Sequence, residues 1–139
     1  MQEKKDGAMY APKGRSKPVC APGDFPAGVI GLDHGHIYGM CNGLTEAGAE
    51  ITLVYDSDPA KVAQFQQAFP SAKAAASKDE VYASNVKMIA SASIPLDRGP
   101  LGVEAMRHGK DFFVDKPPLI TLEHLEQVRQ TVRETGQKF

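Results

Sequence analysis

Residues 27–44 read AGVIGLDHGHIYGMCNGL, and the spacing of their apolar residues changes in the middle. The short apolar run before Gly31 is typical of a buried strand, whereas from Ile37 onward apolar residues fall at the i, i+4 and i+7 positions of a helix. The stretch therefore predicts a strand that turns sharply into a helix over residues 31–36. In α/β proteins such a turn suits a pyrophosphate, because the helix N-terminus offers unpaired N–H groups and a positive dipole potential.

The turn matches the dinucleotide-binding fingerprint, Gly-x-Gly-x-x-Gly or Ala, only in part. Gly31 supplies the first glycine, but Asp33 and His36 occupy the other two positions, and an additional glycine stands at Gly35. A carboxylate aimed at a pyrophosphate would repel it. We therefore expect the Asp33 side chain to point elsewhere, for example back onto the helix N–H groups as a cap. The alternative is a strand–helix turn that binds nothing.

From Pro26 onward, strand and helix signals alternate along the chain. Further strands are expected at residues 51–55, 73–75, 86–93 and 112–114, with further helices after residues 58, 77, 99 and 121. This order predicts an α/β fold: a doubly wound parallel sheet of five strands with helices on both faces, plus a possible start of a sixth strand. Residues 26–139 make up this domain. Residues 1–25, rich in Lys, Pro and Gly and without a periodic apolar face, predict a flexible arm.

Composition limits the classes of partner. The chain has 139 residues, of which 42% are hydrophobic and 24% charged, so it is long enough to bury one globular core. Its net charge of −1 gives no reason to expect nucleic acid or a membrane surface as a partner, and no apolar run approaches the length of a transmembrane helix. Cys20 and Cys41 form no metal-type pair and predict no disulfide, which favours a reducing, cytoplasmic setting.

Sites in parallel sheets gather at the carboxyl ends of the strands. There the sequence places the 31–36 turn, Asp56, residues 91–95 and residues 115–117, which are also the unusual residues of the chain. The Asp56 carboxylate suits the two hydroxyls of an adenosine ribose, and its charge would repel a 2′-phosphate, so NAD is favoured over NADP. The alternative is that Asp56 only caps the turn before Asp58.

Lys116 and the histidines of the turn also carry useful chemistry. An ammonium group at the end of the last strand can hold a ribose hydroxyl or polarise a substrate oxygen, although a lysine before a Pro-Pro turn can equally be a surface residue. The Lys116–Pro117 bond is a candidate for the cis form. Asp33, His34 and His36 are zinc-type ligands in one short turn. No further ligand is evident from the sequence, however, and we predict no metal.

Four blocks of the sequence resemble the N-terminal half of the glucose–fructose oxidoreductase / inositol dehydrogenase / rhizopine catabolism (Gfo/Idh/MocA) family, over about residues 26–139. They are the turn after Ile30, YDSDP at 55–59, SIP at 93–95, and GKDFFVDKP at 109–117, which is similar to the family's Gly-Lys-His-Val-x-x-Glu-Lys-Pro. The resemblance implies a Rossmann-like fold and an NAD(P)-dependent oxidoreductase that transfers a hydride between nicotinamide and a sugar- or polyol-like substrate. It implies a catalytic or orienting role for Lys116. The expected cofactor-binding residues are Gly31, Asp33, His34, Gly35, His36, Asp56, Ser93, Pro95, Asp115 and Lys116.

The sequence departs from the family pattern at three points. Asp33 and His36 replace small residues of the fingerprint, and Arg98 stands where relatives often have histidine. The chain also ends before the second domain, in which the family carries its catalytic histidine and its oligomer contacts. We therefore expect no substrate turnover by this chain alone, and a homo-oligomer as a possible assembly. The alternatives are a non-catalytic binding or scaffolding module with the same fold and, less favoured, a metal-binding turn at residues 33–36.

Overall fold

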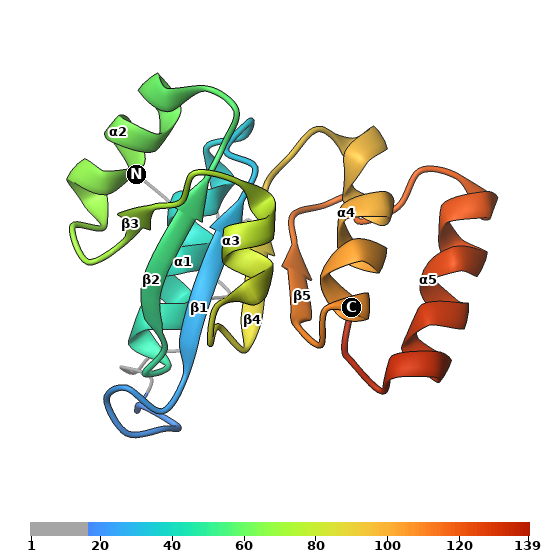
Figure 1. Ribbon diagram of the computed structural model, residues 1–139, viewed down its shortest axis with the longest axis horizontal. Helices are drawn as coiled ribbons and strands as arrows, with labels where there is room; N and C mark the ends of the chain where they lie inside the picture. The colour runs from blue at the N-terminus through green and yellow to red at the C-terminus, as the bar shows by residue number, and fades with distance from the viewer. Residues whose placement is uncertain (1–16) are drawn as a thin grey trace, which may run out of the picture.

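Five parallel strands form one sheet in the computed structural model, which describes residues 17–139 (Figure 1). The strands are β1 (Pro26–Ile30), β2 (Glu50–Tyr55), β3 (Lys73–Ala74), β4 (Met88–Ser91) and β5 (Asp111–Val114). Across the sheet they follow the order β3-β2-β1-β4-β5. The chain starts at the centre, runs outward to β3 and then returns past β1 to β4. The sheet is therefore doubly wound, and the predicted fold class is confirmed.

The helices cover both faces of this sheet. They are α1 (His36–Glu46), α2 (Pro59–Ala68), α3 (Lys78–Ala83), α4 (Pro95–Arg107) and α5 (Leu122–Thr135). Helices α1 and α2 bury one apolar core, which includes Phe65, against the sheet, and α3 and α4 bury a second core, which includes Ile89, on the opposite face. Helix α5 packs against α4 and lies at the end of the molecule beyond β5 (Figure 1).

Local signals fix several helix ends. The Asp58 carboxylate accepts the N–H of Ala60 at 2.9 Å at the start of α2, and the Thr121 hydroxyl accepts the N–H of His124 at 3.0 Å at the start of α5. Gly136 ends α5 with a φ of 73°, a left-handed conformation that glycine adopts without steric cost. These ends agree with the predictions because each depends only on neighbours in the sequence.

Helix α4 begins at Pro95 and not at Pro100, so the prediction for its start is wrong. Pro95 takes a first-turn position, where proline fits because no intrahelical N–H bond is needed, and Pro100 lies inside the helix. Pro100 removes the hydrogen bond to the carbonyl of Leu96, a residue at the exposed start of the helix. The earlier start brings Arg98 into the helix, close to the carboxyl ends of the strands.

Strand β4 is shorter than the predicted range 86–93, and just after its end Ala92 bonds to the turn after β1. The Ala92 N–H donates to the Gly31 carbonyl at 3.1 Å, and the Ala92 carbonyl accepts the N–H of His34 at 3.0 Å. At the β5 edge of the sheet, the Phe112 N–H donates to the Lys138 carbonyl at 2.8 Å. This contact lies where the start of a sixth strand was expected, but the described residues form five strands only.

The predicted arm, residues 1–25, lies mainly outside the described residues. Its last part contacts the domain: the Val19 N–H donates to the Ala47 carbonyl at 2.8 Å, and the Phe25 carbonyl accepts the N–H of Glu50 at 3.0 Å. This part of the chain therefore packs against the loop between α1 and β2.

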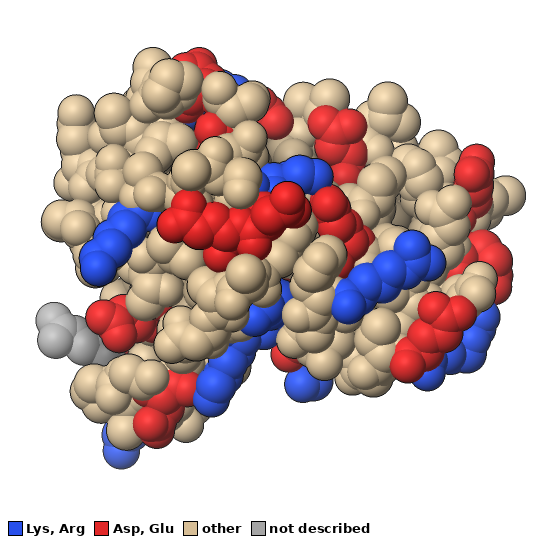
Figure 2. Space-filling view, viewed as in Figure 1, with Lys and Arg blue, Asp and Glu red and all other residues tan. Residues whose placement is uncertain are grey.

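The exterior of the described part carries charges of both signs. On the face shown in Figure 2, acidic and basic side chains are interspersed, and neither sign forms a broad patch there. Among residues 17–139, no helix is both long enough and apolar enough to cross a membrane.

Candidate functional site

Gly31 shapes the turn between β1 and α1. Its φ is +89°, and a Cβ atom at this position would lie 2.9 Å from the Cβ of Ser93. The Gly31 N–H donates to the Tyr55 carbonyl at 3.1 Å, so the turn stays attached to the end of β2. Only glycine combines this backbone conformation with such a close approach to Ser93. Through its contacts with Tyr55 and Ser93, the turn after β1 lies against the ends of β2 and β4.

Asp56 ties the end of β2 to the same turn. One carboxylate oxygen accepts the N–H of Leu32 at 2.7 Å, and the other accepts the N–H of Asp58 at 2.9 Å. The side chain thus holds the backbone just before α2, as the capping alternative expected. Each carboxylate oxygen retains a second lone pair, so these bonds leave acceptor capacity for a ligand hydroxyl.

Asp33 points away from the N-terminus of α1. Its carboxylate accepts a hydrogen bond from the Lys61 ammonium at 2.6 Å and one from the Ile94 N–H at 3.2 Å. The hydrogen bond with Asp33 raises the pKa of Lys61 above its ordinary value. The suggested helix cap is wrong, because Gly35 occupies the N-cap position and no side chain of residues 17–139 caps it. Lys61 instead neutralises the charge of the Asp33 carboxylate, which would otherwise repel a phosphate.

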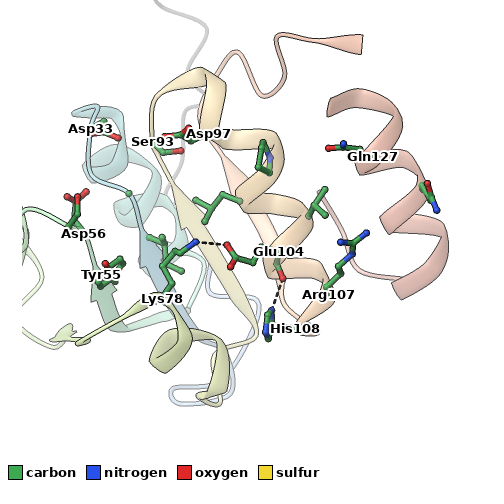
Figure 3. Close-up of a pocket in the computed structure, with 17 residues that line it drawn as sticks. Asp33, Tyr55, Asp56, Lys78, Ser93, Asp97, Glu104, Arg107, His108 and Gln127 are labelled. Atoms are coloured by element: carbon green, nitrogen blue, oxygen red, sulfur yellow. Dashed lines mark hydrogen bonds and ion pairs between the residues drawn. The ribbon is translucent and has the colours of Figure 1, made fainter. Parts of the chain in front are cut away.

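A pocket of about 750 Å³ opens at the carboxyl ends of β1 and β2 (Figure 3). Asp33 and Asp56 lie on one side of it, and Arg107 and Gln127 lie on the opposite side. Four of the predicted cofactor-binding residues line this pocket: Gly31, Asp33, Asp56 and Ser93. The other predicted residues do not line it: His34, Gly35, His36, Pro95, Asp115 and Lys116.

An ion pair crosses the pocket between α3 and α4 (Figure 3). The Lys78 ammonium donates to the Glu104 carboxylate at 2.7 Å, and the Tyr82 hydroxyl donates to the same oxygen at 3.0 Å. Burial raises the pKa of Glu104, but the hydrogen bonds from Lys78 and Tyr82 outweigh burial and hold the pKa below its ordinary value. Sequence reasoning missed these residues, because no motif or spacing links α3 with α4.

A second group of side chains gathers on the other side of the Gly31 turn. His36 Nδ1 lies 3.0 Å from an oxygen of Asp115, and His34 Nδ1 lies 3.8 Å from the other oxygen. The two imidazole rings are 4.1 Å apart between centroids. His34 Nδ1 also accepts the N–H of His36 at 3.2 Å. The turn after β1 and the end of β5 therefore meet through these three residues.

Arg98 is a buried residue that links the turns after β4 and β5. Its Nε donates to the Ser93 carbonyl at 2.7 Å, and its Nη1 donates to the carbonyls of Asp115 and Pro117 at 3.1 and 3.0 Å. Its Nη2 lies 3.4 Å from the Asp115 carboxylate. In the sequence, Arg98 stands out only as a departure from the family pattern. No sequence pattern predicts these contacts, because two of the three partner residues, Asp115 and Pro117, follow β5 and not β4.

Asp115 and Lys116 form the end of β5. Burial raises the pKa of Asp115, but hydrogen bonds from His36 and from the Lys116 N–H, together with the charge of Arg98, hold it below its ordinary value. The Lys116–Pro117 peptide is cis, as suggested. Lys116 itself is exposed, with its N–H bound to Asp115 at 2.8 Å. Its backbone is therefore fixed by buried groups while its side chain faces solvent.

The chain belongs to the Gfo/Idh/MocA oxidoreductase family. The model of this family, described as an oxidoreductase family with an NAD-binding Rossmann fold, matches residues 25–139. The match agrees with the doubly wound sheet and with the glycine turn at its centre. The resemblance predicted from the sequence is confirmed. Comparison with curated proteins finds no match.

Solved oxidoreductases share this fold. A putative oxidoreductase from Erwinia carotovora atroseptica is 46% identical over 83% of this chain and 35% of its own, with a TM-score of 0.79. A WlbA dehydrogenase from Bordetella pertussis, solved with NADH and UDP-GlcNAcA, is 16% identical over 85% of this chain and 36% of its own (TM-score 0.75). A 3-ketoreductase from Actinomadura kijaniata, solved with TDP-benzene and NADP, is 17% identical over 81% and 35% (TM-score 0.71). The chain spans about a third of the length of these structures.

Proposed function

We propose that this chain binds NAD at the carboxyl ends of β1, β2 and β4, as the cofactor-binding part of an oxidoreductase for sugar- or polyol-like substrates. The observation that carries the proposal is the convergence of Gly31, Asp56 and Ser93 on one pocket. Its volume of about 750 Å³ lies within the range of small-molecule and cofactor sites, roughly 300–1,000 Å³.

The adenosine half of the nucleotide fits the Asp56 side of the pocket. A carboxylate there accepts hydrogen bonds from both ribose hydroxyls and repels a 2′-phosphate, which favours NAD over NADP. Both cofactors occur among the structural neighbours, NADH in the Bordetella enzyme and NADP in the Actinomadura enzyme. The preference in this chain therefore rests on Asp56.

Lys116 is the proposed catalytic residue. In this role its ammonium would hold the nicotinamide ribose or polarise a substrate oxygen, and the bound nicotinamide would supply the hydride chemistry. Its backbone, fixed by Asp115 and Arg98, supports this role. The nucleotide sugar UDP-GlcNAcA bound to the Bordetella enzyme supports a carbohydrate-like substrate. We expect the 139 residues by themselves to bind nucleotide without turnover, and steady NADH formation from any polyol would contradict that expectation.

The first experiment is calorimetric titration of the chain with NADH and with NADPH. We expect one NADH per chain, bound more tightly than NADPH. Asp56→Ala should lower the affinity for NADH by at least about tenfold, because charge-assisted hydrogen bonds contribute roughly 1.5–3 kcal/mol to binding. Asp79→Ala, which removes an exposed aspartate outside the pocket, is the matched control.

The ratio of the two affinities separates two effects of Asp56→Ala. Loss of the Leu32 and Asp58 hydrogen bonds would disorder the turn and weaken both nucleotides alike, whereas loss of a ribose contact lowers the preference for NADH. An unchanged ratio would contradict the ribose role. Tighter binding of NADPH by the unaltered chain would contradict the NAD preference.

A non-catalytic binding or scaffolding module is the second candidate, and one observation favours it. The N–H of His36 donates to His34 Nδ1, and the N–H of Ile37 donates to the His34 carbonyl. Part of the backbone that a pyrophosphate would contact is therefore already bonded within the turn. Failure of the folded chain to bind either nucleotide would favour this candidate.

A further inference from the structure

We propose that His34, His36 and Asp115 form a binding site for one divalent transition-metal ion of the Zn²⁺ type. Their potential ligand atoms all lie within 4.8 Å of one another. Two imidazoles and one carboxylate are a ligand set of zinc and of related first-row metals. None of the three residues lines the pocket proposed for the nucleotide.

The structure supplies the ligand that the sequence lacked. In the sequence, Asp33 is the carboxylate next to the histidines, but its oxygens bind Lys61 and the Ile94 N–H. Asp115 takes the place beside the histidines, from a position 79 residues beyond His36. The set therefore becomes three ligands only when β1 and β5 lie in one sheet.

The three ligands are held in place before any ion binds. The Asp115 carboxylate is 7% exposed, and the Lys116 N–H and the Arg98 guanidinium fix its orientation. The His34 backbone is anchored through its N–H to Ala92 at 3.0 Å, and His36 is fixed as the first residue of α1. Such outer contacts are the support that metal ligands require.

The histidine side chains lie half in water, with 55% of His34 and 46% of His36 exposed. An ion bound here would have three protein ligands and a fourth position open to solvent, as in zinc sites that keep one position for water. Imidazole nitrogens disfavour Mg²⁺ and Ca²⁺, which prefer oxygen ligands. The nearby positive charge of Arg98 lowers the affinity, so we expect micromolar rather than nanomolar binding.

The test is titration of the untagged full chain with ZnCl₂ and with CoCl₂, without nucleotide. We expect one ion per chain, a visible absorption band with Co²⁺, and no heat with MgCl₂. His36→Ala should weaken Zn²⁺ at least tenfold and abolish the Co²⁺ band. All proteins carry Cys20→Ser, because this partly exposed thiol could bind zinc independently.

Two aspartate variants identify the carboxylate ligand. Asp115→Asn should lower the affinity for Zn²⁺ as much as His36→Ala does, whereas Asp33→Asn should leave that affinity within about twofold of the value for the intact site. Since Asp115→Asn removes the partner of buried Arg98 and can impair folding, the His36 variant and the Co²⁺ band test the site on their own.

Three results would overturn the proposal. They are absence of Zn²⁺ binding when the site is intact, an affinity of the His36 and Asp115 variants equal to that of the intact site, or loss of binding in Asp33→Asn alone. Because the titration contains no nucleotide, its failure leaves the proposed NAD function untouched, and failure of NADH to bind leaves the metal site untouched.

Discussion

Arg98 and Asp115 form a buried ion pair between α4 and the end of β5, with 3.4 Å between Nη2 and the carboxylate. The remaining guanidinium nitrogens donate to three backbone carbonyls, one in the turn after β4 and two in the turn after β5. One side chain of α4 therefore fixes the position of Ser93, which lines the pocket, and of the segment that presents Lys116.

Removing Arg98 should destabilise the domain strongly. Arg98→Ala leaves the Asp115 carboxylate buried with fewer partners, and loss of one member of a buried ion pair costs about 3–5 kcal/mol of unfolding free energy. Urea denaturation measures the change. Arg133→Ala is the control, because its ion pair with Glu126 is exposed and contributes less than about 1 kcal/mol. Equal effects of the two variants would contradict the role assigned to Arg98.

The Asp115 carboxylate should make the free energy of unfolding depend on pH in the acidic range. Its folded pKa is held below the ordinary value of 3.8, so its ionised form stabilises the fold above that pH. This contribution is lost as the pH falls through the lower, folded pKa. The difference in unfolding free energy between the unaltered chain and Asp115→Asn should therefore shrink below about pH 4. Denaturation curves between pH 6 and pH 2 measure it, and a constant difference would contradict the prediction.

Gly31 should tolerate no side chain. Gly31→Ala forces alanine into a φ of +89° and brings its Cβ to 2.9 Å from Ser93, so we expect a loss of about 1–3 kcal/mol of stability and loss of NADH binding. Gly39→Ala is the matched control. It lies inside α1 with open space at its Cβ position and should stabilise by about 0.5–1 kcal/mol. Thermal unfolding and NADH titration of both variants provide the comparison.

Lys61 should matter more for nucleotide binding than for stability. Lys61→Met leaves the Asp33 carboxylate without its cationic partner beside the phosphate turn. The affinity for NADH should therefore fall by roughly three- to tenfold at low salt and by less at high salt. The double variant Asp33→Asn/Lys61→Met removes the repelling charge and should restore binding. Lys73→Met, at an exposed position on β3, is the control. Equal losses in the single and double variants would show that charge is not the cause.

The sequence by itself was sufficient for the order of the elements, the helix ends at Asp58, Thr121 and Gly136, and the family. These features depend on apolar spacing and on caps, which involve residues only a few positions apart. It also located Gly31 and Asp56 at strand ends that meet in one pocket, because parallel strands all end at the same edge of a sheet.

Only the tertiary structure decided which charged groups pair. Asp33 binds Lys61 and not its own helix, Arg98 joins the turns after β4 and β5, and Asp115 meets His36 across 79 residues of chain. No local signal encodes these partners. The contacts of Asp115 with Arg98 and His36 form because the strand order places β1 and β4 side by side with β5 next to β4. The buried Asp115 charge stays there only because an opposite charge and hydrogen-bond donors meet it. Asp33 meets Lys61 because α2 follows β2, which pairs with β1.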